Sequence, residues 1–164
     1  RDCLLSRGLG DVYKRQIPAS LMDPKIKNRS RLFYLIANIE ASLMKGDNNW
    51  ALLLDPDGFI AEGSGDNFFI IKDKTIISPE GRNMLRGISR DYVMKVIGPE
   101  LGYKVVEKNI EPYDVYNADE AFVTGTLGSI RPVNVIDGRM IEDQCNHKIT
   151  DKLQSLYLQL IKNG

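Results

Sequence analysis

The feature that most constrains this chain is a close succession of short apolar segments separated by tight turns. The apolar segments of strand length are residues 50–54, 59–62, 67–72 and 75–77. Asp55-Pro56-Asp57-Gly58 joins the first two, with proline and glycine in positions that tight turns favour. Asp73-Lys74 joins the last two. Because such short connections suit neighbouring strands of opposite direction, we predict an antiparallel meander.

Helical patterns and further strands surround this meander. One helix face is formed by Leu32, Leu35, Ile36, Ile39 and Leu43. Other helices are expected at residues 87–97, 111–116 and 150–161. Other strands are expected at residues 103–106, 120–124, 131–136 and 140–141, the last two around the turn Asp137-Gly138. The mixture predicts an α/β protein in the broad sense, rich in antiparallel strands, and not a doubly wound parallel sheet.

The composition excludes several classes of protein. The 164 residues suffice for one domain with a buried core, and 27% charged residues is ordinary for a globular chain. The 22 basic residues balance the 22 acidic ones, so we expect neither a nucleic-acid partner nor a membrane partner. Cys3 and Cys145 lack the spacing of a disulfide or metal pair, so no metal is expected. His147 is interpreted as a surface polar residue near the start of the last helix.

Residues 1–16 differ in character from the rest of the chain. They lack sustained periodicity, carry mixed charge and resemble translated sequencing-adaptor sequence. We therefore expect a non-native tail that packs little against the domain, with native sequence beginning near Ile17. A short genuine helix is the alternative.

Three local patterns carry candidate chemistry. Glu62 ends a strand and precedes Gly63-Ser64-Gly65, where small residues allow the backbone to approach a flat ligand. Gly87-Ile88-Ser89 opens a helix, whose free amides and dipole attract anions, although Ser89 is also a plausible helix cap. Lys25 and Lys27 lie in a basic cluster, for which solvated surface charges are the default interpretation.

The stretches Glu62 to Asn67 and Arg86 to Asp91 resemble the large domain of class IV, fold-type IV pyridoxal-phosphate aminotransferases. That family includes branched-chain aminotransferases, D-amino-acid aminotransferases and aminodeoxychorismate lyases. The resemblance spans residues 17–164 and implies a D-amino-acid aminotransferase-like fold, an antiparallel-rich sheet or pseudo-barrel with flanking helices. It also implies that the small N-terminal domain is missing, that pyridoxal 5'-phosphate is the cofactor, and that the intact parent is a cytoplasmic homodimer.

The resemblance assigns roles to individual residues. In the family, the Schiff-base lysine precedes a Glu-Ala pair at a characteristic distance. The matching pair here is Glu40-Ala41, so the resemblance makes Lys27 the expected catalytic, Schiff-base lysine, with Lys25 as the alternative. Glu62 is expected to face the ring nitrogen of the cofactor. The other implied cofactor contacts are Leu85, Ile88, Ser89, Thr126 and Arg31, and the implied substrate contacts are Leu127 and Gly128. Ordinary core packing is the alternative for Leu85, and a solvated charge is the alternative for Arg31.

The implied reaction is ping-pong transfer of an amino group between an amino acid and a 2-oxo acid. Branched-chain substrates are the first choice, although Leu127-Gly128-Ser129 departs from the Ala-Ala-Glu of many branched-chain enzymes. D-amino-acid transamination, aminodeoxychorismate lysis and a non-catalytic binding module are the alternatives. Because the family's active site lies between two domains, we expect the chain alone to bind the cofactor weakly and to transaminate negligibly.

Overall fold

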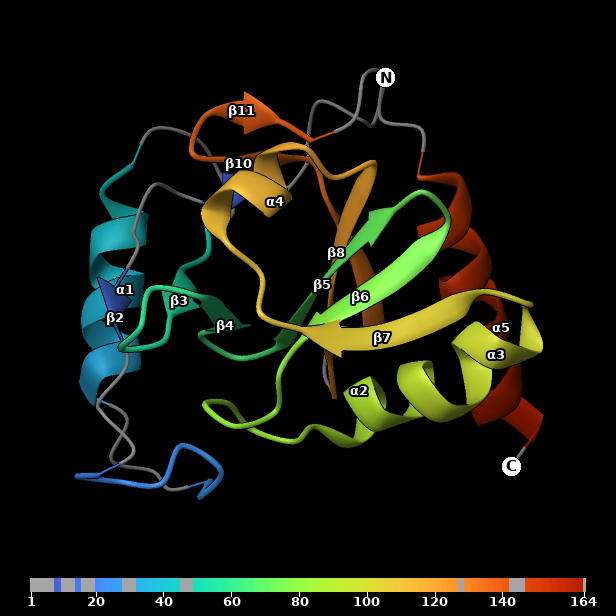
Figure 1. The fold of residues 1–164 in the computed structure, drawn as a ribbon, viewed down its shortest axis with the longest axis horizontal. Coiled ribbons are helices and arrows are strands. Elements are labelled where there is room, and N and C mark those ends of the chain that lie inside the picture. Colours follow the sequence, from blue (N-terminus) through green and yellow to red (C-terminus); the bar gives the residue numbers. More distant parts are fainter. Residues whose placement is uncertain are drawn as a thin grey trace.

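The computed structural model describes residues 8–9, 14–15, 20–27, 32–44, 49–126, 129–141 and 147–163 (Figure 1). The strands are β1 (Gly8–Leu9), β2 (Lys14–Arg15), β3 (Leu52–Leu54), β4 (Ile60–Gly63), β5 (Asn67–Lys72), β6 (Thr75–Pro79), β7 (Lys104–Lys108), β8 (Glu120–Gly125), β9 (Ser129–Val133), β10 (Val135–Ile136) and β11 (Arg139–Met140). The helices are α1 (Leu32–Ser42), α2 (Ile88–Tyr92), the π-helical turn η2 (Val93–Ile97), α3 (Gly98–Glu100), α4 (Pro112–Tyr116) and α5 (Lys148–Asn163). None of these described helices is long and apolar enough to cross a membrane.

The sheet confirms the predicted meander and extends it. Strands β3, β4, β5 and β6 pair in sequence order, each antiparallel to the one before. Strand β7 then pairs parallel with β6, and β8 returns to pair antiparallel with β5. Glu62 is the register partner of Asn67, and Asn67 is also the partner of Thr124. The mixed architecture confirms the predicted fold class, and its register brings three polar residues into one row.

The predicted turns are confirmed by the backbone. Asp73 and Lys74 have φ of 47° and 59°, as a two-residue hairpin with left-handed central residues requires. Asp137 and Gly138, with φ of 52° and 71°, close the β10–β11 hairpin in the same way. These residue types tolerate the left-handed region better than branched residues do, which explains why both turns were visible in the sequence.

The second long helix is continuous from Ile88 to Glu100, but its middle turn is π-helical. The Gly98 backbone N–H donates to the Val93 carbonyl, five residues earlier. Pro99 has no N–H to donate, and its ring would crowd the carbonyl four residues earlier in a regular α-helix. A wider turn relieves this crowding, so the helix passes through Pro99 before it ends.

The central strand β5 is buried on both faces. Phe68 and Ile70 belong to one apolar cluster, whereas Phe69 and Ile71 belong to another. The second cluster is covered by the helix that starts at Ile88 and by α5 (Figure 1). This two-sided burial explains why β5 is an uninterrupted apolar run in the sequence. It also makes β5 a rigid base for the polar residues at its start.

Two details near the C-terminus differ from expectation. Helix α5 begins at Lys148, two residues before the predicted start, which is within the usual uncertainty of helix ends. His147 lies just before this helix, as expected, but its side chain is buried and not on the surface. Its carbonyl accepts from the Asp151 N–H in the first turn of α5. Cys3 and Cys145 lie outside the described residues.

The apolar stripe of α1 faces outward. Leu32, Leu35, Ile36, Ile39 and Leu43 are between 43% and 79% exposed. The buried face consists instead of Tyr34, Ala37 and Ala41, which pack against Ala51 and Leu53. The alanine side chains are completely buried in this contact. An apolar period therefore identified the helix but not the side that packs on the domain.

Two stretches within residues 1–16 pair with the domain, contrary to the expectation that this segment packs little. Strand β1 pairs parallel with β10, and β2 pairs parallel with β3. Backbone pairing at a sheet edge needs no side-chain periodicity, so the sequence pattern did not reveal it. Leu4 and Leu5 lie outside the described residues, and the non-native origin of the segment stays a prediction.

Candidate functional site

A pocket of about 480 Å³ opens where β4, β5 and β8 meet the start of α2. It gathers six of the residues predicted for the site: Lys27, Glu62, Leu85, Ile88, Ser89 and Thr126. The predicted convergence of segments distant in sequence is therefore confirmed. Arg31, Leu127 and Gly128, the remaining predicted contacts, lie outside the described residues.

Glu62 is a buried carboxylate that accepts from at least three donors in the described part of the chain. It is only 2% exposed, at the end of β4. Its Oε1 accepts from the Tyr34 hydroxyl, and its Oε2 accepts from the backbone N–H of Leu85 at 3.1 Å. The Asn67 amide donates to the same Oε2 at 3.3 Å. Hydrogen bonds to a charged acceptor are stronger than neutral ones, so this network stabilises an ionised carboxylate at the pocket wall.

Asn67 joins Glu62 to the loop before α2. Its Nδ2 also donates to the Leu85 carbonyl at 2.8 Å. A Cβ on Gly87 would lie 2.2 Å from the Asn67 Oδ1, so only glycine permits this approach of the loop. A Cβ on Gly63 would lie 2.0 Å from the Asp66 Oδ1. Gly63 and Gly87 thus serve close packing of the pocket wall.

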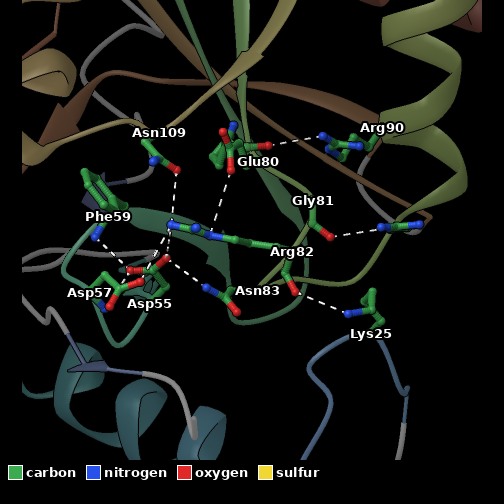
Figure 2. A network of polar contacts seen from close by, with 12 residues as sticks. Lys25, Asp55, Asp57, Phe59, Glu80, Gly81, Arg82, Asn83, Arg90 and Asn109 are labelled. Carbon is green, nitrogen blue, oxygen red and sulfur yellow. Dashed lines mark hydrogen bonds and ion pairs between the residues drawn. The ribbon is translucent and has the colours of Figure 1, made fainter. Parts of the chain in front are cut away.

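The loop from Glu80 to Gly87 is anchored by the polar network in Figure 2. Asp55 is 3% exposed, and its Oδ2 accepts from the Asn83 amide at 2.9 Å. The Arg82 guanidinium lies among acidic groups, with nitrogen-to-oxygen distances of 3.8 Å to Asp55 and 3.9 Å to Glu80. These contacts tie the loop to the β3–β4 turn. They hold Leu85 and Gly87 where Glu62 and Asn67 contact them.

The start of α2 faces the pocket without a side-chain cap. Gly87 is the N-cap residue, with an extended backbone and no side-chain hydrogen bond to the helix. The Ser89 hydroxyl lies 2.9 Å from the Tyr157 hydroxyl of α5, so it does not act as the helix cap considered above. The first amides of a helix carry a partial positive charge and attract anions. This end of the pocket is therefore suited to a negatively charged group.

Thr124 adds a hydroxyl that the sequence interpretation did not single out. Thr124 is one of the residues that line the pocket, and it is 1% exposed. Its Oγ1 has no hydrogen-bond partner among the described residues. Buried hydroxyls are rarely left unpaired, so this atom points to a group that the protein itself does not supply. Thr126, two residues further along, lines the same pocket.

The two candidate lysines differ in their contacts. The Lys25 ammonium lies 2.9 Å from the Asp23 carboxylate and 3.5 Å from the Arg82 carbonyl. The Lys25 backbone N–H also donates to Asp23, and this bond is the main cause that lowers the pKa of Asp23. In the described part of the chain, the Lys27 ammonium has neither a hydrogen bond nor an ion pair. This geometry favours Lys27 as the lysine available to react.

Sequence interpretation missed two residues that shape the site. Tyr34 of α1 contacts Glu62. The sequence feature that could have identified it is its hydroxyl, which is the one polar group in the otherwise apolar start of the helix. Thr124 precedes the noticed Gly125-Thr126 pair and sits in the buried run of β8. Alternation along a strand places residues 124 and 126 on the same face, which is the signal that could have identified it.

Comparisons with known proteins agree with this geometry. The family model for amino-transferase class IV matches residues 6–136. The branched-chain-amino-acid aminotransferase of Pseudomonas aeruginosa is 44% identical over 118 residues, which cover 72% of this chain and 38% of that protein. The putative branched-chain-amino-acid aminotransferase of Methanocaldococcus jannaschii is 40% identical over 147 residues, covering 89% of this chain and 50% of that protein.

A solved structure shows the same arrangement of the chain. The branched-chain amino acid aminotransferase of Thermobaculum terrenum, in its PLP-form, matches with a TM-score of 0.88 at 28% identity. The match covers 99% of this chain and 54% of that one. The chain thus spans about half or less of the length of these relatives. On the family match, the shared fold and the residues gathered in the pocket, the chain belongs to the class IV aminotransferase family.

Proposed function

We propose that this chain is the cofactor-binding part of a pyridoxal-phosphate-dependent aminotransferase. The enzyme would move an amino group between a branched-chain amino acid and a 2-oxo acid, and residues 17–164 would form its large domain. The main supporting observation is the pocket, which Lys27, Glu62 and the start of α2 all line; Lys27 has no hydrogen bond or ion pair among the described residues, and Glu62 is held by the Leu85 amide. The names of the relatives support the branched-chain substrate class.

The pocket residues fit pyridoxal 5'-phosphate. Glu62 suits a protonated ring nitrogen, and the amides that follow Gly87 suit a phosphate. The pocket beside these groups is also lined by Thr124, whose hydroxyl has no hydrogen-bond partner among the described residues. Bound there, the cofactor supplies an aldehyde that reacts with amines and a ring that accepts the electron pair released when a C–H bond breaks.

Each residue then has a physical task. Lys27 Nζ would carry the proton between the α carbon of the amino acid and the C4′ atom of the cofactor. Glu62 keeps the ring nitrogen protonated, because an ionised carboxylate within hydrogen-bond reach favours the charged form of its partner. Leu85 would pack against the flat face of the ring, and Ile88, Ser89 and Thr126, which line the same pocket, would hold the phosphate. Arg31, Leu127 and Gly128 stay predicted contacts to the cofactor and substrate.

The test separates the two lysines. We expect the purified chain to develop the absorbance band of a lysine-bound cofactor when titrated with pyridoxal phosphate. Borohydride reduction followed by peptide mapping should then label Lys27, whereas Lys25 should stay unmodified. Lys27→Ala should lose the band, and Lys25→Ala is the matched control that should keep it. A label on Lys25, or no band with the wild-type chain, contradicts the proposal.

The whole activity is proposed to need more protein than this chain. The chain spans about half of its relatives, and the mouth of the pocket includes Ile88, which is 90% exposed. An open pocket admits water, which weakens the electrostatic interactions that such sites use. We expect negligible transamination of leucine with 2-oxoglutarate by the chain alone. Turnover equal to that of an intact relative would refute this point. We further propose that the intact parent is a cytoplasmic homodimer, as the family resemblance implies.

A further inference from the structure

We propose that the hydroxyl of Thr124 donates a hydrogen bond to the phosphate of the cofactor, which makes Thr124 a phosphate-binding residue beside the start of α2. The inference rests on the proposed function and adds one residue to its site. Thr124 is only 1% exposed and is one of the residues that line the pocket, and its Oγ1 has no hydrogen-bond partner among the described residues.

The position of Thr124 in the sheet indicates which part of a ligand it meets. Register partners on antiparallel strands project their side chains to the same face. Glu62, Asn67 and Thr124 are successive partners across β4, β5 and β8, so they form one row along the pocket. Thr124 lies two strands from Glu62, about 10 Å away on the usual strand spacing. The phosphate arm of a cofactor whose ring nitrogen meets Glu62 extends over a similar length, so Thr124 lies within reach of the phosphate.

The surroundings of Thr124 favour an anionic group at that end. Helix α2 packs against β8, and Gly87 at the helix start lies against Asn67, the row neighbour of Thr124. The helix start offers backbone N–H groups, and Thr126 adds a second hydroxyl to the same pocket. A threonine hydroxyl beside such donors is satisfied when it donates to a phosphate oxygen that the amides also bind. The neighbouring Ser89 hydroxyl already pairs with Tyr157, so Thr124 is the better placed donor.

The experiment compares Thr124→Val with Thr124→Ser in the 164-residue chain. Valine keeps the shape of threonine and removes the hydroxyl, whereas serine keeps the hydroxyl. Dissociation constants are measured for pyridoxal phosphate, for pyridoxal, which lacks the phosphate, and for inorganic phosphate. We expect Thr124→Val to weaken pyridoxal phosphate and inorganic phosphate at least about tenfold, because a bond to a charged group is lost. The affinity for pyridoxal should change less than about twofold, and Thr124→Ser should bind all three ligands nearly as wild type does.

Stability of the ligand-free chain supplies an independent readout. Thr124→Val removes an unpaired buried hydroxyl, so its melting temperature should equal or exceed that of the wild type. Thr150→Val is the matched control, because Thr150 is equally buried but its hydroxyl donates to Glu120 at 2.7 Å, away from the pocket. This control should melt at a lower temperature and bind pyridoxal phosphate unchanged.

The outcomes distinguish a failure of the Thr124 contact from a failure of the proposed function. Equal weakening of pyridoxal phosphate and pyridoxal in Thr124→Val overturns the phosphate contact and assigns the hydroxyl to the ring or to packing. Unchanged binding of all three ligands, which a trapped water would produce, overturns it as well. Both results leave the proposed function intact. A wild-type chain that binds neither pyridoxal phosphate nor inorganic phosphate overturns the proposed function, and the role of Thr124 falls with it.

Discussion

Helices α1 and α5 lie at opposite ends of the view in Figure 1, and each contributes one tyrosine hydroxyl that contacts a residue of the pocket. Tyr34 of α1 donates to Glu62, whereas Tyr157 of α5 pairs with Ser89. The two helices pack differently. Helix α5 buries Leu153 completely, but α1 buries alanines and leaves its leucines and isoleucines exposed. The comparison shows that apolar periodicity identifies a helix but does not by itself identify its buried face. In α1, the buried face is the one that carries Tyr34, whose hydroxyl bonds to Glu62.

The largest expected difference between the helices concerns their leucines. Leu153→Ala should cost about 2–5 kcal/mol in the free energy of unfolding, because it leaves a cavity in the core. Leu35→Ala, the matched change on α1, should cost less than about 0.5 kcal/mol, since Leu35 is 55% exposed. Urea denaturation followed by circular dichroism measures both. Similar losses for the two variants would mean that the outer face of α1 is packed in solution.

The next prediction compares the two tyrosines. Tyr34→Phe removes a donor from a buried carboxylate and should cost about 1.5–3 kcal/mol, whereas Tyr157→Phe removes a bond between neutral hydroxyls and should cost about 0.5–1.5 kcal/mol. Chemical denaturation of each variant gives these values. Repeating both changes in a Glu62→Gln background is the control, because the neutral amide should bring the two costs closer together. A larger loss for Tyr157→Phe in the wild-type background contradicts the assigned roles.

Close packing under α1 can be tested by filling it. Ala41→Leu inserts a large side chain where the residue is 0% exposed, and overpacking of this kind should cost about 1–3 kcal/mol. Asn38→Leu on the exposed side of the same helix is the control and should be nearly neutral. Thermal melts of the two variants separate the faces. A neutral Ala41→Leu would mean that Ala41 is not packed as tightly in solution as its complete burial indicates.

The smallest expected effect on stability accompanies a change in solubility. Ile39→Lys on the outer stripe of α1 should leave the free energy of unfolding within about 0.5 kcal/mol, because Ile39 is 52% exposed. It should also reduce self-association, since contiguous exposed apolar side chains promote it. Light scattering as a function of concentration measures this effect. Leu158→Lys on α5, where the leucine is 42% exposed, is the comparison and should change self-association less.

The sequence predicted the local features of the fold well. The strands from residue 50 to 79 were predictable because apolar runs alternate with turn residues such as Asp73 and Lys74 that accept positive φ. The return of β8 to β5 and the parallel pairing of β6 with β7 had no local signal, because they depend on contacts between distant segments. The meeting of Lys27, Glu62 and Ser89 was predictable from motif resemblance, whereas the roles of Tyr34 and Thr124 required the geometry.

The network around Glu62 has a consequence for the speed of ligand capture. The partners described for this carboxylate, from Tyr34, Asn67 and the Leu85 amide, all belong to the protein, and Arg82 and Asn83 hold their loop from behind. Because these hydrogen bonds exist before a ligand binds, this side of the pocket does not have to rearrange on binding. Little conformational entropy of the protein is therefore lost there. Association on this side should therefore be governed by diffusion and orientation. Differences in affinity among variants of the wall should then emerge as differences in residence time.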